Sequence, residues 1–244
     1  MKKITIFSIL PVVLPLIVNA SAPLTGNEVL QKIDNQQLTK DKTSVAVMKL
    51  IDSSGTTVER TLKMYMKGAN DKLIRFLSPA DIKGTAFLSR GSENMWLYLP
   101  ALSRVRRIAG YASHGDFMGS DFNYRDLSSS GLAEDFNAAI DSYKDHEYAL
   151  TLTPKKSGSA YSKVKLWVKD DTFVPLKIEF YDPSGKLLKI LTNTEMKEIN
   201  GKWFPMSMEM RNVQENHTTY IIVKEMKINT GLSNRDFTER ALKE

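Results

Sequence analysis

The chain has 244 residues, of which 42% are hydrophobic and 25% are charged, and its formal net charge at pH 7 is +6. It contains no cysteine, which excludes disulfides, thiolate metal sites, a cysteine nucleophile and a lipid-attachment cysteine. The charge is mildly basic and mixed along the chain, so it does not indicate a nucleic-acid partner.

The first 20 residues have the three parts of a secretory signal peptide. Lys2 and Lys3 precede an apolar run over residues 4–18, which ends in small residues around Ala20. We expect cleavage after Ala20 and one mature domain over residues 21–244. The pattern predicts an exported protein in the periplasm, with secretion into the medium as the alternative.

An uncleaved membrane anchor is the other interpretation of this segment. The apolar run contains Pro11 and Pro15 and is shorter than the roughly 20 residues that a spanning helix needs. Cleavage is therefore the favoured prediction.

Next in the chain, residues 28–38 carry apolar side chains on one helical face after a plausible cap. Most of the following sequence alternates with period two, as half-buried strands do. In the first half, strands are predicted at residues 43–51, 57–66, 72–77, 85–90 and 94–99, with 104–108 as one further short strand.

Residues 128–139 are a weaker helix candidate, with apolar side chains at a spacing of four. The second half then predicts longer strands at residues 147–154, 162–169, 175–181, 187–199, 203–213 and 218–230, and a short C-terminal helix that begins near Ser233. An antiparallel sheet of about ten or eleven strands with a few short helices on one face is an α+β fold.

A group of acidic residues lies between the two halves. Asp116, Asp121 and Asp126 are near His114, so a metal site or an acid/base pair is conceivable. Their spacing of five matches neither a calcium-binding loop nor a zinc motif. We therefore expect these carboxylates to cap turns and to pair with local arginines, and we predict no catalytic residue, metal or cofactor.

Arg104, Arg106 and Arg107 fall within four residues. They form either a solvated basic edge or a contact surface for a partner or a lipid headgroup, since guanidinium groups suit phosphate.

Several large apolar side chains are restricted to one face of a strand. Met64 and Met66 alternate on one strand, and Met206, Met208 and Met210 alternate on another. Flexible thioethers suit a surface that accepts variable apolar partners, but they also fill ordinary cores. We expect these methionines to line a lipid-binding cavity, and the alternative is a core under the helices.

The strand at residues 94–99 is apolar on both faces. Trp96 and Tyr98 share one face, and Met95 and Leu97 are on the other. Such a strand is either covered on both sides or turns one face toward a cavity. We include Trp96 and Tyr98 among the expected cavity residues.

Four short segments resemble the LolA-like outer-membrane lipoprotein-sorting family. They are Pro-Ala-Asp-Ile-Lys-Gly-Thr at residues 79–85, Trp-Leu-Tyr-Leu-Pro at 96–100, Arg-Val-Arg-Arg-Ile at 104–108 and Phe-Met-Gly-Ser-Asp-Phe at 117–122. The resemblance is to a branch distinct from the LolA carrier itself and often associated with RND-type lipid exporters. It implies an unclosed β-barrel that is covered by helices and shields acyl chains on its concave face.

Together these features predict a non-enzymatic periplasmic carrier. Its expected cargo is a lipoprotein or another lipid bound in an apolar cavity, with transient membrane contact and an inner-membrane RND-type or ABC transporter as candidate partner. The alternative is an interaction module, either an accessory subunit of an RND-type lipid exporter or an envelope-stress sensor.

Overall fold

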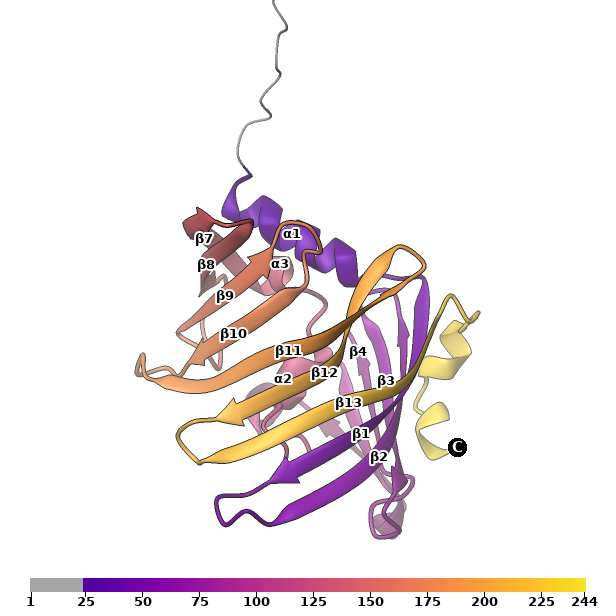
Figure 1. The fold of residues 1–244 in the computed structure, drawn as a ribbon. Helices are drawn as coiled ribbons and strands as arrows, with labels where there is room; N and C mark the ends of the chain where they lie inside the picture. Colours follow the sequence, from indigo (N-terminus) through magenta and orange to yellow (C-terminus); the bar gives the residue numbers. More distant parts are fainter. Residues whose placement is uncertain (1–23) are drawn as a thin grey trace, which may run out of the picture.

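The computed structural model describes residues 24–244, which form one antiparallel sheet of 13 strands (Figure 1). The strands are β1 (Asp41–Ile51), β2 (Thr57–Lys67), β3 (Asp71–Ser78), β4 (Ala86–Arg90), β5 (Met95–Leu99), β6 (Arg104–Ile108), β7 (Phe136–Lys144), β8 (Glu147–Pro154), β9 (Lys163–Lys169), β10 (Pro175–Tyr181), β11 (Leu187–Ile199), β12 (Lys202–Asn212) and β13 (His217–Ile228). The predicted signal peptide lies outside the described residues.

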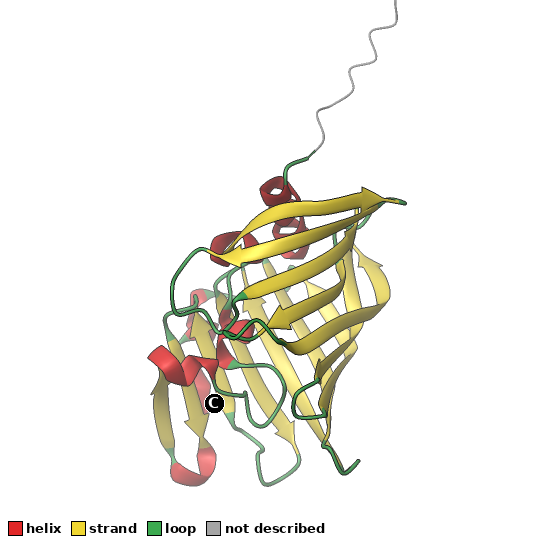
Figure 2. Cartoon of the chain, turned by 90° about the vertical axis from the view of Figure 1, so that its left-hand side faces the viewer, coloured by secondary structure: helices red, strands yellow, loops and turns green. Residues whose placement is uncertain are grey.

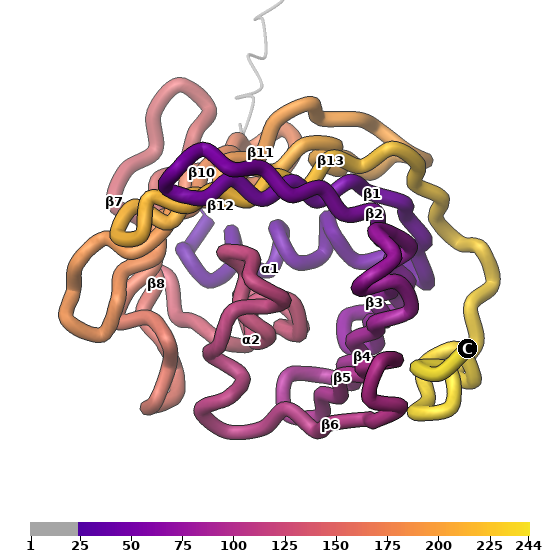
Figure 3. The backbone as a smooth tube through the Cα atoms, turned by 90° about the horizontal axis from the view of Figure 1, so that it is seen from below, coloured from indigo at the N-terminus to yellow at the C-terminus, as the bar shows by residue number. Residues whose placement is uncertain are grey.

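The sheet consists of two meanders joined at its centre. Its order is β6-β5-β4-β3-β2-β1-β13-β12-β11-β10-β9-β8-β7, so β1 pairs with β13 and only β6 and β7 are edges. The sheet curls without closing (Figure 2). Seen from below, it surrounds helices α1 (Gly26–Gln37) and α2 (Tyr124–Ser128) (Figure 3). The predicted α+β half-barrel is therefore confirmed.

Helix α1 lies at one end of the half-barrel (Figure 1). It begins after Thr25, whose side chain and that of Glu28 form a capping box. Val29, Leu30 and Ile33 are buried on the face that packs into the core. The helix predicted at residues 28–38 is confirmed, with its start two residues earlier.

The chain between the two sheet edges, residues 109–135, is called the inner segment. It contains a 3-10 helix, η2 (Gly110–His114), α2 and the four-residue α3 (Leu132–Asp135). The view from below shows α2 on the concave side of the sheet (Figure 3). Within residues 24–244 every helix is too short or too polar to cross a bilayer.

The helix predicted at residues 128–139 is wrong. Apart from Ser128, which ends α2, only α3 is helical there, and from Phe136 the chain continues as β7. Phe136 is buried, whereas Ile140 is 36% exposed, so their spacing of four does not mark one helical face. An edge strand with mostly exposed residues has little alternation, which is why β7 left no period-two signal and the predicted strand number was too small.

Side chains alternate between two apolar clusters on opposite faces of the sheet. On β2, Leu62 and Met64 face the main concave core, whereas Tyr65 packs in a smaller outer cluster. The outer cluster is built around Phe237 and Leu242 of the C-terminal segment. The predicted C-terminal helix is two 3-10 helices instead, η3 (Asn234–Phe237) and η4 (Ala241–Lys243), which lie outside the barrel (Figure 1).

Candidate functional site

A cavity of about 610 Å³ lies on the concave side of the sheet, next to α1 and the inner segment. Its volume is within the range of pockets that hold small molecules. Its apolar lining comes from α1, β2, the inner segment, β7 and β10–β12, and it includes Ile33, Met66, Phe122, Leu127, Leu132, Phe136, Ile178, Phe180, Leu191, Met208 and Met210.

The cavity reaches solvent near the end of α1. Leu38 belongs to its lining and is 43% exposed. Gly68 and the loop residues 156–158 also line it and are exposed. A ligand can therefore enter between α1 and these loops, and Leu38 offers it an apolar contact.

Three lysines are part of the cavity lining, and two of them, Lys42 and Lys72, lie inside it, whereas Lys156 is in an exposed loop at the mouth. Lys42 on β1 and Lys72 on β3 are both paired with Met66 on β2, which lies between them. Burial lowers the pKa of each ammonium group from its ordinary value to about 8. The Lys72 ammonium donates to the carbonyl of Ser129, and the Lys42 ammonium lies 5.2 Å from the centre of the Phe204 ring.

Asn193 on β11 also lines the cavity and is about nine-tenths buried. Its Nδ2 donates to the carbonyl of Pro175 at 2.8 Å, but its Oδ1 has no hydrogen-bond partner among residues 24–244. An unpaired buried acceptor costs free energy. Asn193 is thus ready to accept a hydrogen bond from a bound molecule.

The inner segment is bonded to both halves of the sheet. On one side Arg60 of β2 donates to the carbonyl of Met118, and Phe117 is fully buried against Phe76 and Phe87. On the other side the Asp121 amide donates to Thr219 Oγ1 at 3.0 Å. The segment therefore ties the two meanders together across the concave face and gives the cavity a fixed inner wall.

The carboxylates of this segment do not pair with the local arginines as expected. Asp126 forms a capping box with Asn123 at the start of α2, but its ion-pair partner is Lys189 of β11, with Nζ and Oδ2 2.7 Å apart. Asp121 accepts from Thr219 Oγ1 at 2.7 Å and lies 2.8 Å from Nδ1 of His217. Turn capping is thus confirmed for Asp126, and the expected arginine partners are wrong for both.

The phenol of Tyr161 completes this polar cluster. It donates to Asp126 at 2.8 Å and accepts from Asn123 at 2.9 Å. Burial raises the pKa of Tyr161 well above its ordinary value. Within residues 24–244, no three His, Asp or Glu side chains come together as a metal ion would require.

Three of the seven expected cavity residues, Met66, Met208 and Met210, are part of the lining. Met64 and Met206 pack against the adjoining concave core. The aromatic pair Trp96 and Tyr98 lies instead in the outer cluster, where it packs around Phe237 and Leu242.

The cause is that β5 is covered on both faces. Met95 and Leu97 face the main core, so Trp96 and Tyr98 face the C-terminal 3-10 helices. This is the first of the two arrangements considered for an apolar strand, and it removes both aromatic residues from the cavity.

The three arginines lie on the edge strand β6. Arg104, Arg106 and Arg107 are exposed and have no ion pair with any residue in 24–244. They are not part of the main cavity lining.

Sequence analysis missed Lys42, Lys72 and Asn193. The two lysines carry a signal in retrospect, because each occupies an inward position of a strand that also places large apolar residues inward, such as Met48 on β1 and Phe76 on β3. A charged residue at such a position indicates either an ion pair or a ligand contact.

Comparisons with known proteins agree with the fold. A family model described as "Uncharacterized protein" matches residues 68–244. A comparison with curated proteins found no match.

Solved structures give closer relatives. An outer membrane lipoprotein-sorting protein domain from Vibrio parahaemolyticus is 33% identical, with a TM-score of 0.82 over 90% of this chain and 98% of that one. A DUF1329 family protein from Desulfovibrio piger is 32% identical, with a TM-score of 0.83 over 89% of this chain and 97% of that one.

A LolA superfamily protein from Nitrosomonas europaea is 23% identical and has a TM-score of 0.76, over 90% of this chain and 100% of that one, so it shows the shared fold. The matches to the two relatives above 30% identity extend over nearly the whole length of those relatives. They confirm the resemblance that the four sequence segments indicated. The chain belongs to the DUF1329 family of LolA-like outer-membrane lipoprotein-sorting proteins.

Proposed function

We propose that this protein is a periplasmic carrier that binds the acyl chains of a lipoprotein or another lipid and shields them on the way to the outer membrane. The observation that carries the proposal is the cavity of about 610 Å³ on the concave face, with methionines from β2 and β12 in its lining and an apolar side chain at its mouth. Burial of apolar chain in such a cavity stabilises the complex by about 25 cal/mol per Å² removed from water. The predicted signal peptide and the lipoprotein-sorting relative support the export and cargo class.

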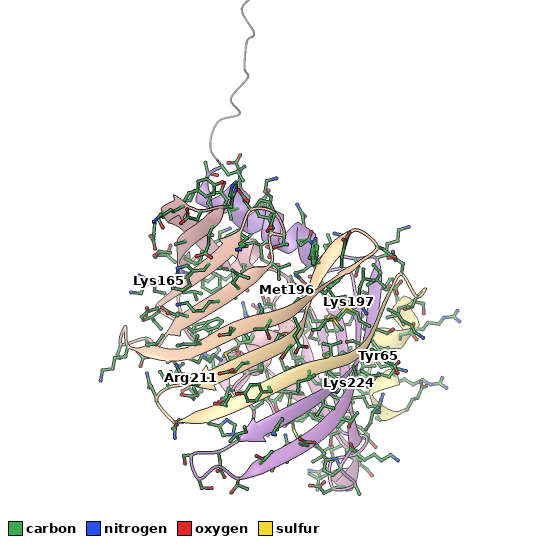
Figure 4. All side chains as sticks on the ribbon, in the orientation of Figure 1. Tyr65, Lys165, Met196, Lys197, Arg211 and Lys224 are labelled. Carbon is green, nitrogen blue, oxygen red and sulfur yellow. The ribbon has the colours of Figure 1, made fainter. Side chains whose placement is uncertain are left out.

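The test uses delipidated protein and a fluorescent acyl probe. Met208→Trp fills part of the cavity, so its affinity for the probe is expected to fall about tenfold or more. Arg211→Trp, on the same strand but on the outer face of β12 (Figure 4), is the matched control and keeps wild-type affinity. Wild-type protein that takes up no probe, and carries no extractable lipid when purified from its host, would refute the carrier.

The second candidate is an interaction module. Within residues 24–244 the outer edge of β6 pairs with no strand, and Arg104, Arg106 and Arg107 are exposed on it, which suits a contact with an acidic surface or an added strand. A transporter subunit of the inner membrane is the expected partner. Affinity capture should then recover one membrane protein in equal amount with the wild type but not with a triple Arg→Gln variant. Capture that is the same for both proteins would remove this candidate.

A further inference from the structure

We propose that Lys42 and Lys72 bind the anionic head of an amphiphile whose apolar chain occupies the cavity. The inference rests on the proposed carrier function and narrows its cargo to molecules with a carboxylate or phosphate head. Neutral or cationic amphiphiles would be disfavoured at the same site.

The geometry places both ammonium groups on one side of the cavity. Residues of even number on β1, β2 and β3, such as Met48, Leu62 and Phe76, face the concave core. Lys42 and Lys72 share this parity and flank Met66 on the middle strand. Two strand spacings put their backbones about 10 Å apart. Two flexible side chains at that separation can converge on one anion between them.

The carboxylates that line the cavity are already engaged elsewhere. Asp34 accepts from the amides of Leu132 and Ala133 at 2.8 Å each, and Asp126 pairs with Lys189. Asp135 and Glu93 have their own partners in the inner segment, because both pair with Arg125. Within residues 24–244, no carboxylate lies within ion-pair distance of Lys42 or Lys72.

Two ammonium groups with no counter-charge in a low-polarity cavity are costly for a protein to keep. Burial lowers the pKa of both ammonium groups to about 8, and the charge of Lys42 lowers that of Lys72 further, so the lowered pKa reflects that cost. They remain in contact with the cavity space, which itself reaches solvent. An anion from outside relieves the cost, whereas a purely structural role leaves it in place.

Asn193 independently indicates that a ligand completes the cavity. Its buried Oδ1 lacks a partner in the described part of the chain, although the side chain is nine-tenths buried. An amphiphile that carries a hydroxyl or amide N–H near its head or along its chain supplies that donor. The cavity thus offers cationic donors, one neutral acceptor and an apolar wall, a combination that fits an anionic amphiphile.

The experiment compares ligands of equal chain length at pH 7. Dodecanoate, dodecyl phosphate and dodecanol, all below their critical micelle concentrations, are titrated against delipidated protein that holds a neutral fluorescent acyl probe. A charge-assisted hydrogen bond is worth about 1.5–3 kcal/mol, so at least one of the two anions is expected to displace the probe at a concentration about tenfold to a hundredfold lower than dodecanol. The two anionic arms distinguish a carboxylate head from a phosphate head.

The variants isolate the lysines. The double variant Lys42→Met/Lys72→Met keeps most of the side-chain length and apolar contact. In this variant the concentration at which each anion displaces the probe should come to within about threefold of that for dodecanol, and the value for dodecanol should not change. The matched control is Lys224→Met, because Lys224 is exposed on β13 outside the cavity (Figure 4). If the double variant does not fold, the single variants Lys42→Gln and Lys72→Gln must each weaken anion binding.

The outcomes separate this inference from the carrier function. If dodecanol and both anions bind the wild type equally, or if the variants keep the preference for anions, the headgroup site is refuted and the carrier stands. If no amphiphile displaces the probe because the probe itself does not bind, both proposals fall.

Discussion

The ammonium group of Lys189 on β11 and the carboxylate of Asp126 on α2 form a buried ion pair, with Nζ and Oδ2 2.7 Å apart. The same ammonium group donates to the carbonyl of Asp121 at 2.9 Å, and it lies 5.2 Å from the ring centre of Tyr161 and 5.5 Å from that of Phe180, two rings that pack against each other. This one side chain therefore fixes the inner segment against the half of the sheet formed by β7–β13.

Removal of this lysine should destabilise the fold strongly. Lys189→Met leaves the Asp126 carboxylate buried without a counter-charge, and loss of one partner of a buried pair costs about 3–5 kcal/mol. Urea denaturation measures the difference in free energy of unfolding. Lys197→Met on the same strand is the control, since Lys197 is exposed and labelled on the outer surface in Figure 4, and it should change stability by less than about 0.5 kcal/mol. Equal effects of the two substitutions would contradict the structural role of the pair.

A second prediction concerns the aromatic contact that holds the inner segment to the first half of the sheet. Phe117 is fully buried, and its ring centre lies 5.7 Å from that of Phe76, 5.6 Å from Phe87 and 5.5 Å from Tyr124. Phe117→Ala opens a cavity there and should cost about 3–5 kcal/mol in the free energy of unfolding. Phe117→Leu keeps most of the volume and should cost clearly less. If the free energy of unfolding of the alanine variant falls by less than about 1 kcal/mol, this ring does not anchor the inner segment.

The sheet was largely predictable from sequence because its signals are local. Period-two alternation places β1 and β2 within two residues of their observed ends, and turn residues separate them. The edge strand β7 was missed because its outer residues are nearly all exposed and leave no alternation to recognise. Thus the strands with one buried face were found, as was the short exposed strand β6, whereas β7 was not.

The candidate site was less predictable because it depends on which face of a strand is covered. Alternation placed Met208 and Met210 on one face of their strand, and this face lines the cavity. The face of β5 that carries Trp96 and Tyr98 is instead covered by the C-terminal 3-10 helices. No local pattern encodes where those helices dock. The ion pair between Asp126 and Lys189 spans 63 positions and was equally invisible to spacing arguments.

A third prediction tests the coupling of α1 to the inner segment. The two carboxylate oxygens of Asp34 accept from the amides of Leu132 and Ala133, at the start of α3. Asp34→Ala leaves both amides without these acceptors and should cost about 1–2 kcal/mol, as loss of a helix cap does. Faster amide hydrogen exchange over residues 132–135 is the direct measurement. Asp34→Asn retains one acceptor, so its exchange rate should fall between those of the wild type and Asp34→Ala. Unchanged exchange in the alanine variant would show that α1 and α3 are not coupled.

The last prediction is a rise of stability with pH in the unliganded protein. The pKa of Lys42 and of Lys72 is about 8 in the folded chain, against 10.5 for an ordinary lysine. Between these values the unfolded chain binds more protons than the folded one, so the free energy of unfolding increases as the pH rises through 8.

Nearby groups set the limits of that window. Asp135 favours the proton on Lys72, whereas Lys42 disfavours it. Tyr161, whose pKa is raised by burial, acts in the opposite direction once tyrosines of the unfolded chain ionise near pH 10. The useful range is therefore about pH 8 to 10.

Between pH 7.5 and 9.5, the free energy of unfolding measured with urea should rise by on the order of 4 kcal/mol more in the wild type than in Lys42→Met/Lys72→Met. Each lysine contributes about 2 kcal/mol, since one pKa unit corresponds to about 1.4 kcal/mol. A bound anion reverses the argument, because its charge raises the pKa of both lysines and keeps them protonated in the folded state. With saturating dodecyl phosphate, the extra rise in the free energy of unfolding of the wild type between the two pH values should disappear. A wild type and a double variant with parallel pH profiles would show that neither lysine has a lowered pKa, and would remove the electrostatic basis for anion binding in the cavity.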